Sequence, residues 1–78
     1  MKTQVRFNLE TLDDIYRHSH NAFLNIIAKH REKLLTSDYT IFLYDEYFEE
    51  DKKVEKVRKE FESLYEYNTW LDEHYPSN

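Results

Sequence analysis

Three groups of side chains have types and spacings that could support chemistry, and the histidines are the first. His18 and His20 are two residues apart, so on a helix they point about 200° away from each other and cannot chelate one ion. Asp14 and His18 share a helix face, but two ligands are too few for a metal site. The chain has no cysteine, and its 78 residues leave little room for a pocket of about 300 Å³. We therefore expect no metal, no cofactor and no enzymatic activity.

The second group is an acidic and aromatic cluster in the middle of the chain. Its carboxylates alternate with tyrosines, and the cluster comprises Tyr44, Asp45, Glu46, Tyr47, Glu49, Glu50 and Asp51. Carboxylates attract and pair with Lys or Arg, while Tyr rings supply rigid contact area, so this segment predicts a binding face for a basic protein. Carboxylates spaced like phosphates could also imitate a nucleic-acid backbone. The alternative is a solvated helix end whose aromatic rings point into the core.

The third group is a basic run, formed by Lys52, Lys53, Lys56, Arg58 and Lys59. It could contact phosphate groups. However, the pairs Glu49–Lys53 and Glu55–Lys59 have the i,i+4 spacing of a solvated helix face. Nucleic acid is therefore the less favoured partner, and a dimeric nucleic-acid-binding regulator is the second functional hypothesis.

The C-terminal segment carries aromatic and apolar residues, namely Tyr67, Trp70, Leu71 and Tyr75. The simplest interpretation is a lid on the hydrophobic core. The alternative is an exposed anchor for a partner or for self-association.

These groups must be positioned by the secondary structure, and the sequence predicts an all-α fold. Apolar residues recur at steps of three and four from Leu9 to Leu35, which predicts one long first helix capped by Asn8. A heptad pattern predicts a helical region over 38–66, and Asn68 is expected to cap a short helix over 69–75. The expected architecture is a single domain, 1–78, with an extended arm over 1–8 and a small bundle of three or four helices.

An α+β fold with short strands at about 2–7 and 39–44 is the alternative architecture. Residues 39–44 are β-branched or aromatic, which suits a strand. The absence of glycine argues against it, because tight hairpin turns usually require residues with positive φ.

Composition limits location and partners. The net charge is −5, and it is uneven: residues 1–37 hold six Lys or Arg against four Asp or Glu, whereas 38–78 hold five against twelve. An acidic half repels nucleic acid and attracts basic surfaces. No apolar run is long enough for a signal sequence or a membrane span, so we expect a cytoplasmic protein. A chain this short buries a small core, which favours a homodimer or stabilisation by a partner.

Two short stretches, 37–40 and 75–78, are similar to pieces of the DNase-colicin immunity proteins, which are small acidic helical inhibitors. The intervening sequence does not follow that family, so no residue role is transferred from it. The predicted function is a small acidic interaction module that binds and modulates or inhibits a basic macromolecule, as immunity-like inhibitors and phage-type antagonists do. A structural helical subunit is the third hypothesis.

Overall fold

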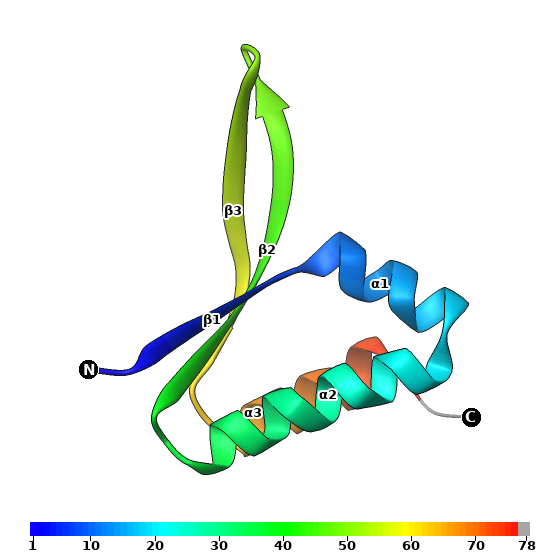
Figure 1. Ribbon diagram of the computed structural model, residues 1–78, viewed down its shortest axis with the longest axis vertical. Coiled ribbons are helices and arrows are strands. Elements are labelled where there is room, and N and C mark those ends of the chain that lie inside the picture. The colour runs from blue at the N-terminus through cyan, green and yellow to red at the C-terminus, as the bar shows by residue number, and fades with distance from the viewer. Residues whose placement is uncertain (77–78) are drawn as a thin grey trace.

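The computed structural model describes residues 1–76 and contains both strands and helices (Figure 1). The elements are β1 (Thr3–Asn8), α1 (Leu9–His18), α2 (His20–Leu35), β2 (Tyr39–Glu49), β3 (Lys52–Phe61) and α3 (Leu64–His74). The predicted all-α bundle is therefore wrong, and the fold is α+β.

The three strands form one mixed sheet in the order β1-β2-β3. β1 runs parallel to β2, and their register extends from Thr3 opposite Tyr39 to Asn8 opposite Tyr44. β2 and β3 form an antiparallel hairpin that ends with Glu49 opposite Lys52. Parallel neighbours need a long crossover, and α1 and α2 provide it. The segment expected to be an extended arm is thus an edge strand of the sheet.

The predicted helical region over 38–66 is instead the β2–β3 hairpin. In β2, the buried Ile41 and Leu43 alternate with the half-buried Phe42 and Tyr44, which is the period of a strand with one covered face. The sheet register shifts between Leu43 and Tyr44, because β3 has a bulge there. Such an extra residue changes which side chains share a face, and it gives the strand an irregular apolar spacing that resembles a helical one.

The predicted single helix from Leu9 to Leu35 is two helices that meet at Ser19. Ser19 has extended backbone angles, φ −151° and ψ 97°, and its Oγ accepts a hydrogen bond from the Ala22 N–H at 3.3 Å. It therefore ends α1 and caps α2. The apolar pattern has a gap at this point, because no apolar residue lies between Tyr16 and Ala22. The break lets both helices pack over one small sheet.

The C-terminal helix α3 begins five residues earlier than predicted. Ser63 caps it by accepting a hydrogen bond from the Glu66 N–H at 3.1 Å. Asn68, the expected cap, lies inside the helix, where its Oδ1 accepts a hydrogen bond from Arg31 Nε at 2.8 Å. The contact joins α3 to α2.

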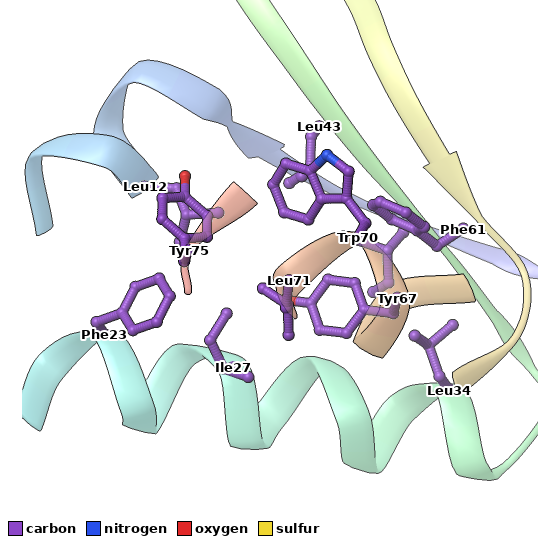
Figure 2. Close-up of a cluster of buried hydrophobic side chains, with 11 residues drawn as sticks. Leu12, Phe23, Ile27, Leu34, Leu43, Phe61, Tyr67, Trp70, Leu71 and Tyr75 are labelled. Atoms are coloured by element: carbon purple, nitrogen blue, oxygen red, sulfur yellow. The ribbon is translucent and has the colours of Figure 1, made fainter. Parts of the chain in front are cut away.

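The hydrophobic core lies between the covered face of the sheet and the three helices (Figure 2). Its central side chains come from every helix and from two strands; they include Leu12, Phe23, Ile27, Leu34, Ile41, Leu43, Phe61, Tyr67, Trp70, Leu71 and Tyr75. Much of its volume is aromatic, and the rings meet edge to face, as Phe61 and Tyr67 do at 5.2 Å between centroids.

One polar pair is buried inside this core. His30 on α2 is 4% exposed, and its Nδ1 lies 2.7 Å from the hydroxyl of Tyr67 on α3. Burial lowers the pKa of His30 to about 4, and the charge of Lys33 adds to the effect. Burial also raises the pKa of Tyr67 above its usual value. The pair is therefore uncharged at neutral pH and forms a neutral hydrogen bond between the two helices.

The β2–β3 hairpin projects beyond the helices as a separate ribbon (Figure 1). The radius of gyration is 13.2 Å, whereas a compact chain of this length has about 11.5 Å. None of the helices formed by residues 1–76 is both long and apolar enough to span a membrane.

Candidate partner-binding site at the hairpin tip

Within residues 1–76, no third strand pairs with the outer half of the hairpin. β1 pairs with β2 only as far as Tyr44, whereas β2 and β3 continue to pair from Asp45 to the turn. The helices do not cover this part of the ribbon (Figure 1). Isolated two-stranded ribbons are only marginally stable in water. A contribution to the stability of the fold therefore does not explain why this ribbon protrudes.

The turn at the tip has an unfavourable backbone for its residues. Glu50 and Asp51 have φ values of 52° and 64°, which are the left-handed values of a type I′ hairpin turn. Gly, Asn and Asp are the residues that tolerate these angles, and a residue such as Glu50 costs about 1–2 kcal/mol there. The sequence-based argument that a chain without glycine avoids such turns is therefore wrong. The chain places two adjacent carboxylates where the backbone disfavours them.

Two aromatic side chains next to the turn are exposed. Phe48 is 74% exposed and Tyr47 is 43% exposed. Adjacent residues of a strand point to opposite faces, so the two rings lie on opposite sides of the ribbon. Phe48 was not among the predicted site residues, because a helical interpretation directs its ring into the core. A strand assignment would have indicated that this ring is exposed, because Phe48 lies just before the turn.

The predicted carboxylates divide into two groups in the structure. Asp45 lies 3.3 Å from Arg58 Nε, and Glu46 lies 3.2 Å from Lys53 Nζ, so both pair across the hairpin. The hydrogen bond from Lys53 to Glu46, reinforced by that carboxylate's charge, raises the lysine's pKa. Within residues 1–76, no cation lies within salt-bridge distance of the remaining three carboxylates, which are Glu49, Glu50 and Asp51.

Tyr44 also belongs to the paired part of the ribbon. Its ring lies 5.3 Å from the guanidinium carbon of Arg6, and Arg6 contacts Glu55 at 2.6 Å. Three residues of the predicted cluster are thus partly buried against cations. Tyr44 lies against Arg6, whereas Asp45 and Glu46 lie against Arg58 and Lys53. These three residues are less exposed than the five residues nearer the turn.

The tip cluster is the set of exposed residues that remains: Tyr47, Phe48, Glu49, Glu50 and Asp51. It combines two aromatic rings with three carboxylates at the end of a projecting two-stranded ribbon. Charged groups at a protruding point steer a partner of opposite charge, and exposed rings supply contact area. The arrangement suits binding.

Within the described part of the chain, no group of three metal-ligating side chains lies close enough together to hold a metal ion.

The structure places the predicted C-terminal anchor in the core. Tyr67 is fully buried, and Trp70, Leu71 and Tyr75 are each at most 9% exposed. Figure 2 shows these side chains packed between α2 and the sheet. These four side chains belong to the hydrophobic core and do not form an exposed anchor.

The basic run lies on β3, an edge strand of the sheet. Its side chains point alternately to the two faces, and Lys53 and Arg58 already pair with carboxylates of β2. The run therefore makes no continuous cationic surface of the kind that follows a nucleic-acid backbone. Lysines on an edge strand also prevent edge-to-edge pairing between molecules, which gives the run a structural role.

Comparison with known proteins provides no further guide to this site, because it finds no matching family model, no similar curated protein and no similar solved structure.

Proposed function

We propose that this protein is an acidic interaction module that binds and modulates a basic protein through the tip cluster. The observation that carries the proposal is the exposure of Phe48, at 74%, beside three carboxylates that form no salt bridge within residues 1–76. A large exposed ring is commonly part of an interface, and the adjacent charges favour a cationic partner. The backbone strain at Glu50 and Asp51 supports the same proposal, because strain that persists is often tied to function.

The mode of binding follows from the shape of the ribbon. A narrow two-stranded projection can enter a groove or cleft, as a flat helix face cannot. Phe48 would then be the buried anchor, and Glu49, Glu50 and Asp51 would pair with Lys or Arg around it. Occlusion of a basic site, such as a nucleic-acid-binding or catalytic groove, is the form of inhibition that this geometry favours. We place this activity in the cytoplasm.

The test compares capture of a basic partner from a native lysate by variants with matched charge changes. The tip variant changes Glu49, Glu50 and Asp51 to Lys. Its control changes Glu10, Glu32 and Glu73 to Lys; these residues are exposed on the helices and form no salt bridge within residues 1–76. Both variants alter the net charge equally, so a general electrostatic effect would weaken both.

We expect the wild type and the control to retain one stoichiometric basic protein at moderate salt and the tip variant to lose it. A Phe48→Ser variant separates the ring from the charges and should weaken capture at every salt concentration. Equal capture by the tip variant and its control would refute the proposal. Capture of DNA or RNA, lost steeply as salt rises, would instead support the regulator hypothesis based on β3.

A further inference from the structure

A second surface on this protein has the features of a ligand site, and it lies on the side formed by the helices. A groove of about 600 Å³ opens where the end of α1, the first half of α2 and the end of α3 meet. We call it the helical groove. Its volume lies within the range of small-molecule sites, about 300–1,000 Å³, and exceeds what the sequence led us to expect.

The floor of the helical groove is apolar and largely aromatic. Phe23, Ile27, Leu71 and Tyr75 are buried there, and the ring of Tyr16 packs against Phe23 and Tyr75 at centroid distances of 5.0 and 4.6 Å. Figure 2 shows Phe23 and Ile27 on α2 facing Tyr75 and Leu71.

The two floor tyrosines direct their polar ends elsewhere. The hydroxyl of Tyr75 donates a hydrogen bond to Asp13, and that of Tyr16 donates to the Pro76 carbonyl at 3.5 Å. A ligand resting on this floor would therefore contact carbon atoms and ring faces.

The rim of the helical groove is cationic, although the chain as a whole is acidic. Arg17, His20 and Arg31 line it, and Asp72 is the one carboxylate among the residues that do so. No carboxylate within residues 1–76 lies within salt-bridge distance of Arg17 or Arg31. Two guanidinium groups without ionic partners thus face an apolar surface.

One of the two guanidinium groups is already held in place. The Nε of Arg31 donates to Asn68 Oδ1 at 2.8 Å, which fixes the side chain between α2 and α3. The donors at its two terminal nitrogens remain available, and a guanidinium offers them in a planar fork that matches a carboxylate. A donor positioned before binding loses less entropy when the ligand arrives.

We infer that the helical groove binds a small amphipathic carboxylate, whose aromatic or alkyl body lies on the floor between Phe23 and Tyr75 and whose anionic group pairs with one guanidinium group of the rim, that of Arg17 or that of Arg31. The aromatic floor requires an apolar body, and the excess of guanidinium groups over carboxylates at the rim requires an anion. This site lies on the helices and is independent of the tip cluster, so either proposal can fail alone.

The test is a titration with naphthalene-2-carboxylate, followed in ¹H–¹⁵N correlation spectra of the whole chain. Naphthalene-2-carboxamide has the same rings without the charge and serves as the control ligand. We expect saturable shifts at Phe23, Leu24, Ile27 and Leu71 with the carboxylate, and binding at least tenfold weaker with the amide.

Variants identify the residues that hold the anion. Either Arg17→Gln or Arg31→Gln should weaken binding of the carboxylate about tenfold, and the variant that does so identifies the arginine that pairs with the anion. Lys29→Gln changes an exposed cation of α2 that does not line the groove, and it should leave binding unchanged. Because Arg31 also bonds Asn68, the Arg17 variant is the cleaner one. Shifts outside the groove, equal binding of the amide, or no effect of either arginine variant would overturn the inference. So would binding only of acidic peptides, which would make the groove a protein interface.

Discussion

The buried His30–Tyr67 pair makes the stability of this fold depend on pH in a defined window. His30 has an ordinary pKa of 6.5 in the unfolded chain and a pKa of about 4 in the folded protein. Between these values the unfolded state binds a proton that the folded state does not. The free energy of unfolding therefore falls as the pH is lowered from 6.5 to 4 and is independent of His30 above 6.5.

The size of the effect follows from the difference between the two pKa values. A difference of about 2.5 units corresponds to about 3 kcal/mol, at about 1.4 kcal/mol per pH unit within the window. Small domains have a total stability of only about 5–15 kcal/mol, so this loss is a large share. His30 is 4% exposed, and its Nδ1 already bonds Tyr67, so the folded protein offers the extra charge little solvation.

Urea unfolding at a series of pH values measures this loss, because Trp70 is the only tryptophan and its burial makes its fluorescence report the core. A His30→Gln variant keeps a side chain that can form a hydrogen bond with Tyr67, but this side chain does not titrate. Between pH 6.5 and 4, its free energy of unfolding should therefore fall by about 3 kcal/mol less than that of the wild type. His20→Gln, at an exposed position, is the matched control and should follow the wild type. Parallel curves for the wild type and His30→Gln would refute the assignment.

Two further predictions concern local backbone geometry. Replacing Glu50-Asp51 with Asn-Gly should stabilise the protein by about 1–2 kcal/mol in urea unfolding, because both residues have positive φ; no gain would show that the turn is not strained. Ser19→Ala should lower the free energy of unfolding by about 1 kcal/mol, because it removes the cap of α2. Ser19→Asp should retain most of the stabilisation that this cap provides. Equal losses in both Ser19 variants would show that the Ala22 N–H does not need a side-chain acceptor.

Local capping signals at the start of the chain were predictable from sequence. Asn8 caps α1 as expected, with its Oδ1 accepting from the Thr11 N–H at 3.1 Å. The break at Ser19 was not foreseen, because a serine is tolerated inside a helix and the apolar residues on both sides fit one helical stripe despite the gap between Tyr16 and Ala22. Only the size of the sheet, a tertiary feature, requires the chain to turn back there.

The hairpin could not be distinguished from a helix by its pattern alone. Val54 and Val57 are three residues apart, which is a helical spacing, yet both lie in β3, where they are opposite Tyr47 and Tyr44. The spacing of charged residues also favoured a helix, because Glu49 lies four residues before Lys53. In the structure, Lys53 instead pairs with Glu46 across the hairpin. The absence of glycine removed the usual turn signal, so Glu50-Asp51 gave no indication of a reversal.

The structure divides the predicted binding cluster into two parts that the sequence did not distinguish. The cluster from Tyr44 to Asp51 contains the exposed tip, yet its first three residues are occupied by contacts with β1 and β3. Which carboxylates remain free depends on cross-strand partners that no sequence spacing shows. Phe48, the most exposed ring in the cluster, became a candidate only once its strand was known.

Site-specific photo-crosslinking tests the central claim most directly. A p-benzoylphenylalanine in place of Phe48 would report contacts at the tip, and the same group in place of Tyr65, which is 80% exposed on α3, is a control of similar exposure. The account predicts that a single basic protein is crosslinked in native lysate from position 48 and not from position 65. Crosslinking to the same protein equally from both positions, or to no protein from position 48, would contradict it.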